Sequence, residues 1–86
     1  MTYQINLSKS SEKSLEKLEK NIRERIIDFL YVKARTNPHL YKEPLYGNKK
    51  GLWKFRVGDY RIICEIFNER LVILVIEIGH RREVYK

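Results

Sequence analysis

The sequence predicts one α+β domain in which two N-terminal helices pack on one face of a small, mainly antiparallel β-sheet. Three observations predict this class. Apolar residues recur at helical spacing early in the chain, alternating or continuously apolar segments follow residue 52, and short turn motifs separate these segments. With 86 residues the chain has the length of a single domain, residues 1–86, and the expected order of its elements is β-α-α-β-β-β.

The first expected element is a short strand, because "YQINL" alternates between apolar and polar residues. Such a strand has to join the sheet to be stable. The serines of "SKSS" can then cap a helix, and an apolar stripe with three- and four-residue spacing follows. This stripe fits one long helix or two helices that break near Asn21, and we favour a helical hairpin or a kinked pair. Its members are Leu15, Leu18, Ile22, Ile26 and Phe29 or Leu30.

Residues 38–51 are predicted to form a loop, since Pro38 and Pro44 bracket "PHLYKEP" and the turn-rich "YGNKKG" comes next. Lys49 and Lys50 lie beside glycines in that stretch, so we expect both side chains to be exposed. They are either solvated or in contact with a phosphate.

Three antiparallel strands are expected from residue 52 onward: "LWKFRV", "YRIICEIF" and "LVILVIEI", separated by the turns "GD" and "NER". A two-residue type II′ turn at "GD" places Arg56 opposite Arg61 and Lys54 opposite Ile63. Because side chains alternate between the two faces of a strand, an almost wholly apolar set then faces the helices. This set is Trp53, Phe55, Val57, Tyr60, Ile62, Cys64 and Ile66.

The other face of this hairpin carries Lys54, Arg56 and Arg61, and we expect these three cations to share one exposed surface. Like charges directly opposite each other destabilise a sheet. A polyanion bound to that face would make the Arg56–Arg61 pair favourable; alternatively, both arginines extend into water.

The register of the last strand is open, because "LVILVI" is apolar on both faces. A two-residue turn would pair Arg61 with Ile76, and a three-residue turn would pair it with Glu77. We favour the second register, which is electrostatically better. It places Glu77, Gly79 and Arg81 on the cationic face.

The net charge is +7, from 18 basic and 11 acidic residues, and the excess is spread along the chain rather than gathered in a tail. A basic folded domain indicates a polyanionic partner, most often nucleic acid, although solubility alone also explains such a charge.

The single cysteine, Cys64, lies within an apolar run, so we expect a buried thiol and no internal disulfide, which fits a reducing compartment. The N-terminus lacks the basic and apolar regions of a secretory signal, and the longest apolar run is far shorter than the ~20 residues that span a bilayer. These features predict a soluble, cytoplasmic protein with no membrane partner.

No metal or cofactor site is expected, because His39 and His80 are far apart in the sequence and no glycine-rich phosphate loop is present. What remains is a cluster of Lys, Arg and Tyr side chains, which can cleave RNA without a metal because the RNA supplies its own 2′-hydroxyl nucleophile. Arginines can clamp the phosphate, a lysine among like charges can act as a base, and a tyrosine can stack on an unpaired base. A basic binding module without catalysis fits this pattern equally well.

Two stretches, "LWKFRVGDYRIICEI" and "VIEIGHRREVY", resemble the RelE/ParE superfamily of toxins from bacterial and archaeal toxin–antitoxin systems, and the likeness extends over essentially the whole chain. The resemblance to the RelE branch implies a ribosome-dependent endoribonuclease, or mRNA interferase, which cuts messenger RNA in the A site by 2′-hydroxyl attack and so inhibits translation. It also implies a RelB-like antitoxin as partner, through which the complex binds operator DNA.

The resemblance also assigns roles to individual residues. Lys54 matches a strand lysine proposed as base or phosphate ligand, and Arg61 matches an arginine that stabilises the phosphate charge. Arg81 matches an arginine assigned as proton donor or charge stabiliser, and Tyr85 matches a tyrosine that stacks on a messenger base. Arg56 stands where the best-known member has a second lysine, so that Lys54 would carry the role of base. Further RNA contacts are expected from Lys49, Lys50, His80 and Arg82.

The sequence departs from the family pattern near its C-terminal end. His80 takes a position that is lysine in the well-known member, and its imidazole could donate a proton. The chain ends one residue after Tyr85, so an additional C-terminal helix is not expected, and Tyr85 is predicted to become ordered only when RNA or antitoxin is bound. Two other functions stay open: a ParE-like toxin that inhibits DNA gyrase by protein binding, and a non-catalytic basic RNA-binding relative.

Overall fold

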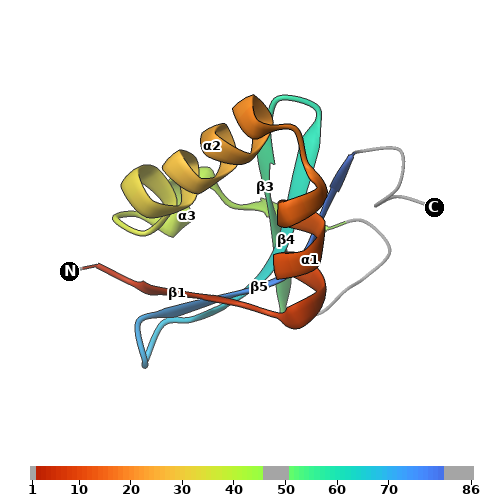
Figure 1. Ribbon diagram of the computed structural model, residues 1–86. Coiled ribbons are helices and arrows are strands. Elements are labelled where there is room, and N and C mark those ends of the chain that lie inside the picture. The colour runs from red at the N-terminus through yellow and green to blue at the C-terminus, as the bar shows by residue number, and fades with distance from the viewer. Residues whose placement is uncertain (1, 46–50, 81–86) are drawn as a thin grey trace.

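The computed structural model describes residues 2–45 and 51–80 of the chain. Its helical segments lie on one side of a five-stranded sheet with the strand order β1-β5-β4-β3-β2 (Figure 1). Strand β1 runs parallel to β5, and the other neighbours are antiparallel. The predicted α+β class is therefore confirmed. The elements are β1 (Gln4–Leu7), α1 (Lys9–Lys17), α2 (Lys20–Asp28), the π-helical η1 (Phe29–Ala34), α3 (Pro38–Tyr41), β2 (Glu43–Pro44), β3 (Leu52–Val57), β4 (Tyr60–Phe67) and β5 (Val72–His80).

The N-terminal helical region is a pair of helices, as favoured from the sequence. Ser8 caps α1, because its side-chain oxygen accepts a hydrogen bond from the backbone N–H of Ser11 at 3.0 Å. The break falls at Leu18 and Glu19, just before the predicted region near Asn21, since both residues are extended, with ψ of 151° and 144°. The guanidinium of Arg23 then donates to the carbonyl of Leu18 at 3.2 Å, which satisfies an acceptor left open by the break.

The expected loop over residues 38–51 is wrong in its first half, where the chain forms α3 and the two-residue strand β2. Pro38 is buried at the first turn of α3, a position that suits proline because its φ is preset and its missing N–H is not needed. Strand β2 then pairs with β3, so that Glu43 lies opposite Lys54. The prediction missed this strand because two residues carry no periodic pattern.

The predicted β3–β4 hairpin is confirmed residue by residue, with Lys54 opposite Ile63 and Arg56 opposite Arg61. Gly58 has a φ of +61°, as the first position of a type II′ turn requires. The apolar set of this hairpin faces the helices, and three of its members, Phe55, Ile62 and Cys64, are fully buried in the core.

The predicted register of β5 is wrong, because Arg61 pairs with Gly79 and not with Glu77. Two irregularities cause the shift. The β4–β5 turn spans residues 68–71, with Leu71 at a φ of +55°, and a β-bulge then leaves Ile76 without a ladder partner. Each adds one residue, and because side chains alternate, a shift of two residues keeps Glu77 and Gly79 on the predicted face.

The bulge is held by the start of α1. The hydroxyl of Ser8 donates to the carbonyl of Ile76 at 2.7 Å, and the fully buried hydroxyl of Ser11 lies 3.1 Å from the carbonyl of Val75. The backbone N–H of Ser8 also donates to Val75 at 2.9 Å. The cap of the first helix and the register of the last strand are thus one structural unit.

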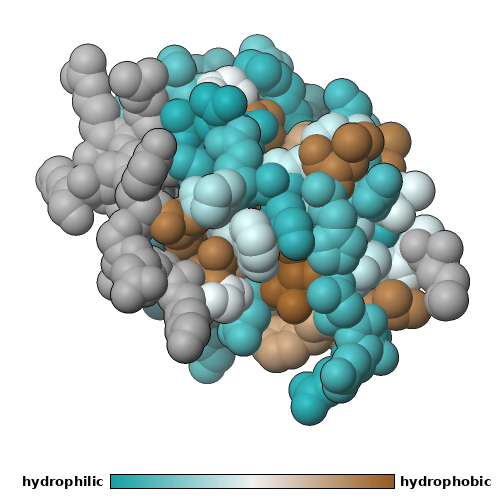
Figure 2. All heavy atoms as spheres, turned by 180° about the vertical axis from the view of Figure 1, so that it is seen from behind, coloured by the Kyte–Doolittle hydropathy of each residue, from teal (hydrophilic) through white to brown (hydrophobic). Residues whose placement is uncertain are grey.

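Hydrophilic side chains cover much of the side seen in Figure 2, with separate apolar patches between them. Larger apolar side chains are also exposed on the helical segments, namely Ile27, Tyr31, Val32 and Leu40. Within residues 2–45 and 51–80, no helix is long and apolar enough to cross a membrane.

Candidate functional site

The face of the sheet opposite the helices carries the predicted cations of β3 and β4. Cross-strand neighbours share a face, so the pairs Lys54–Ile63 and Arg56–Arg61 place all three cations on it. The expectation that this surface is exposed is wrong for two of them, because Lys54 is 7% and Arg61 8% exposed. Both lie on inner strands of the sheet.

Arg56 is the exposed member of the set, and β2 supplies it with a partner. The Nε of Arg56 donates to a carboxylate oxygen of Glu43 at 2.9 Å. This ion pair lowers the net positive charge of the face. Sequence reasoning missed Glu43 because it did not predict strand β2.

The guanidinium of Arg61 turns toward the end of the sheet at the β3–β4 turn. Its Nη1 lies 3.4 Å from the backbone carbonyl of Tyr60, the preceding residue. Two guanidinium groups on paired strands, with an ammonium group on the same face, can bind an anionic phosphate through several charge-assisted hydrogen bonds. The arrangement therefore suits stabilisation of charge on a phosphodiester.

Several predicted site residues lie outside the described residues, and their roles stay predictions. The prediction that Tyr85 becomes ordered only with a ligand is therefore not tested, and neither is the predicted position of Arg81 beside the other cations. The residues concerned are Lys49, Lys50, Arg81, Arg82 and Tyr85.

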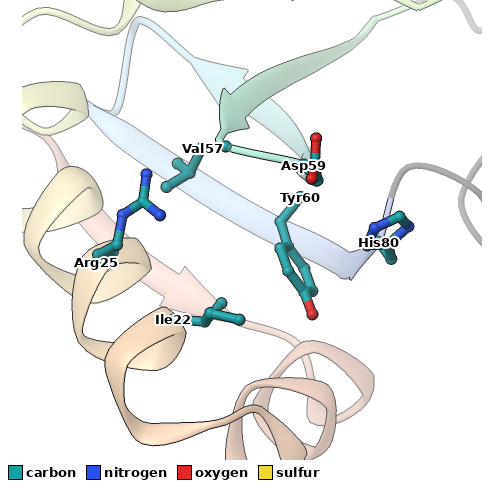
Figure 3. Close-up of a pocket in the computed structure, with 7 residues that line it drawn as sticks. Ile22, Arg25, Val57, Asp59, Tyr60 and His80 are labelled. Atoms are coloured by element: carbon teal, nitrogen blue, oxygen red, sulfur yellow. The ribbon is translucent and has the colours of Figure 1, made fainter.

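His80, predicted to contact RNA, lies on the other face of the sheet from Arg61. It is the ladder partner of Tyr60, and the two rings meet edge to face, with centroids 5.4 Å apart and planes at 83°. Both rings line a cavity of about 350 Å³ between α2 and the β3–β4 turn (Figure 3). Arg25 of α2 also lines it, and sequence reasoning did not single out Arg25 or Tyr60 as functional.

The remaining candidates for chemistry are structural. Cys64 is fully buried, and this burial raises the pKa of its thiol from 9.0 to about 12, so the side chain is not a nucleophile at neutral pH.

His39 lies 2.7 Å from the amide oxygen of Asn68, which also accepts a hydrogen bond from Tyr3 at 2.9 Å. This cluster ties the N-terminus to the β4–β5 turn. Within the described ranges, no group of three or more His, Cys, Asp or Glu side chains is placed to hold a metal ion.

Comparison with known proteins finds toxins of toxin–antitoxin systems. Residues 5–85 match the family described as ParE toxin of type II toxin-antitoxin system, parDE. A putative RelE-like toxin protein of Escherichia coli is 30% identical over 82 residues, which are 94% of this chain and 85% of that protein. Toxin RelG of Mycobacterium tuberculosis is 23% identical over 86 residues, covering 100% of this chain and 99% of RelG.

The fold also matches solved structures. The toxin–antitoxin complex RelBE2 of Mycobacterium tuberculosis contains a chain that superposes with a TM-score of 0.87 at 22% identity, covering 94% of this chain and 100% of that one.

Proposed function

This chain belongs to the RelE/ParE superfamily and is a toxin of a type II toxin–antitoxin system, and we propose that it is a ribosome-dependent endoribonuclease. The proposed reaction is cleavage of messenger RNA in the A site, by attack of a 2′-hydroxyl group on the adjacent phosphate. Cleavage of the message in this way inhibits translation. DNA lacks the 2′-hydroxyl, so the reaction is confined to RNA.

The placement of Lys54, Arg56 and Arg61 on one face of two paired strands carries this proposal. The fold does not require cations there, since burial of charge costs free energy and an apolar or small polar side chain suits a sheet as well. An RNA phosphate gives the cluster a function. Arg61 stabilises the charge on the phosphate, Lys54 serves as base or phosphate ligand, and Arg56 assists in binding the phosphate.

The C-terminal residues complete the proposed site. Arg81 protonates the leaving 5′-oxygen or stabilises its charge, and Tyr85 stacks on a base of the message. These two assignments rest on the resemblance of "GHRREVY" to the family pattern.

The proposed protein partner is an acidic, RelB-like antitoxin. Related folds were solved as complexes of this kind, among them the RelE–RelB complex of Pyrococcus horikoshii and the RelBE2 complex. A net charge of +7 favours an acidic partner, both for affinity and for rapid association. We further propose that the pair acts in the cytoplasm, where the ribosome is, and that the complex binds operator DNA through the antitoxin.

The test is primer extension on messenger RNA after induction of the toxin, together with cleavage of a defined message on purified ribosomes. We expect Arg61→Ala and Arg81→Ala each to lower the cleavage rate by about 100-fold or more, the usual cost of losing a group that stabilises transition-state charge. Arg61→Lys is expected to restore only part of the rate, because an ammonium group cannot form the bidentate fork.

Arg70→Ala is the matched control, because Arg70 is exposed at the β4–β5 turn. Circular dichroism and urea unfolding establish whether each variant folds. If folded Arg61→Ala and Arg81→Ala proteins cleave messages at the rate of the Arg70→Ala control, the ribonuclease proposal is wrong.

A second candidate function follows from the matched family description, which names ParE. A ParE-like toxin inhibits DNA gyrase by protein binding and needs no catalytic set. Toxicity that persists in both arginine variants, with stalled replication and inhibited gyrase supercoiling in vitro, would favour it. Binding to RNA or ribosomes with no cleavage by the wild-type protein would instead indicate a non-catalytic basic relative.

A further inference from the structure

We propose that the cavity between α2 and the β3–β4 turn binds one unpaired nucleotide of the RNA, next to the nucleotide that is cleaved. The base would lie against Tyr60 and His80, and its phosphate would lie against Arg25. This inference rests on the proposed ribonuclease function and adds a second RNA-binding place on the other face of the sheet.

The cavity has a shape and size that suit a nucleotide. Its volume of about 350 Å³ lies in the lower range of small-molecule pockets. One wall comes from α2, another from the β3–β4 turn, and the third from the last residue of β5 (Figure 3). The labelled lining residues are Ile22, Arg25, Val57, Asp59, Tyr60 and His80.

Arg25 supplies a positive charge at this cavity. Its guanidinium lies over the turn, with an Nη atom 3.4 Å from the position that a Cβ on Gly58 would take. Among the described residues Arg25 forms no hydrogen bond and no ion pair, although the side chain is held close to the turn. Asp59 is the one carboxylate among the described residues that line the cavity, and it lies apart from Arg25, on the other side of Val57 in Figure 3. With respect to the described residues, the guanidinium is therefore available for an anion, and it lies within van der Waals range of the turn at Gly58.

Tyr60 and His80 form an aromatic corner. Because their planes meet at 83°, a planar base that stacks on one ring meets the other ring with its edge. Stacking of bases on such rings tolerates any sequence, since every base has a π-face. The aliphatic side chains of Ile22 and Val57 line the cavity as well, which favours a flat, partly apolar group over a fully hydrated ion.

The cavity is also close to the proposed site of cleavage. Tyr60 precedes Arg61, whose Nη1 lies 3.4 Å from the Tyr60 carbonyl. On the ladder between β4 and β5, the pair Arg61–Gly79 is directly followed by the pair Tyr60–His80. An RNA strand that leaves the cationic face at the end of the hairpin therefore reaches the aromatic corner within one residue of the ladder.

The test measures binding of a 2′-O-methyl hexanucleotide, which cannot be cleaved, by fluorescence anisotropy at several salt concentrations. The hexanucleotide carries one abasic position, placed at each site in turn. The proteins are wild type, Arg25→Gln, Tyr60→Leu and the control Lys20→Gln. The control removes the same charge from the exposed start of α2, outside the cavity.

We expect one abasic position to weaken binding to the wild type by about 5- to 150-fold, the effect of losing one stacked base. In Tyr60→Leu, an abasic site at the same position should no longer weaken binding. Arg25→Gln should lower the slope of log affinity against log salt by about 0.7, as for one lost contact with a single-stranded phosphate. Lys20→Gln should leave both quantities close to those of wild type. Since Tyr60 packs on the core, Arg25→Gln keeps the test valid if Tyr60→Leu does not fold.

Equal affinity and equal salt slope in wild type and Arg25→Gln, including no measurable binding by either, would overturn the inference. The inference would also be overturned if Arg25→Gln and Tyr60→Leu lost affinity for an antitoxin fragment while their RNA binding stayed unchanged. The ribosomal cleavage assay with Arg61→Ala is separate from this test. If the wild type cleaves messages and Arg25→Gln binds RNA as the wild type does, only the proposed nucleotide binding in the cavity is refuted. If the wild type does not cleave messages, the ribonuclease function itself is refuted.

Discussion

Replacing Ser8 by alanine is expected to destabilise the protein by about 2 kcal/mol, because one hydroxyl serves both the first helix and the last strand. As an acceptor, its oxygen caps α1 at the N–H of Ser11, 3.0 Å away. As a donor, it satisfies the carbonyl of the bulged residue Ile76 at 2.7 Å. Alanine removes both hydrogen bonds without adding a clash.

The magnitude is the sum of two ordinary terms. Loss of a serine cap costs about 1 kcal/mol. A buried or partly buried hydrogen bond contributes about another 1 kcal/mol. For a domain of this size, about 2 kcal/mol corresponds to a fall in Tm of roughly 8–16 °C.

Urea unfolding followed by circular dichroism measures the total loss of stability, and a second variant separates the two terms. Ser8→Asp keeps the cap, since aspartate caps as well as serine, but its carboxylate cannot donate to Ile76. It should recover at most about 1 kcal/mol of the loss, because its carboxylate also faces the carbonyl of Ile76. Ser10→Ala is the control, because Ser10 is exposed in the first turn of the same helix.

Hydrogen exchange gives an independent readout of the bulge. In Ser8→Ala the amides of residues 77–80 should exchange faster relative to those of β3, since the bulge positions this part of β5. The reasoning is refuted if Ser8→Ala and Ser10→Ala agree within about 0.5 kcal/mol, the usual range for surface changes.

Three further predictions concern the core, the hairpin turn and the ion pair. The folded-state pKa of Cys64 is raised from 9.0 to about 12, so the unfolded chain loses this proton first as the pH rises. The free energy of unfolding of wild type should therefore fall relative to Cys64→Ala by about 1.4 kcal/mol per pH unit above pH 9. If urea unfolding gives the same difference in stability between the two proteins at pH 8 and at pH 10, this prediction is contradicted. Gly58→Ala should cost about 1–2 kcal/mol in urea unfolding, because φ is +61° there, and an equal effect of Asp59→Ala would argue against turn strain. Glu43→Gln should change stability by less than about 1 kcal/mol, as for other exposed ion pairs, and a larger loss would mean that Arg56 depends on this carboxylate for its structure.

The candidate site shows where sequence reasoning succeeds and where it stops. Placing Arg56 opposite Arg61 needed only a two-residue turn and the alternation of side chains, and both are local properties. The burial of Lys54 and Arg61 is a property of the tertiary structure, and the local sequence pattern of the hairpin does not indicate it. The same holds for the cavity at Tyr60, because Arg25 comes from a helix more than thirty positions earlier in the chain.

Local sequence patterns were enough to predict the α+β class, the pair of helices, the β3–β4 hairpin and the face on which its cations lie. Each follows from a periodicity of apolar residues or from a turn of defined length, and such signals act over a few residues. The register of β5 depends on contacts with distant parts of the chain, since "LVILVI" presents an apolar side chain to either face. The contact that holds its bulge comes from Ser8, which is 68 residues away from Ile76 in the sequence. That contact brings His80 beside Tyr60, and with it the cavity for which we propose a nucleotide.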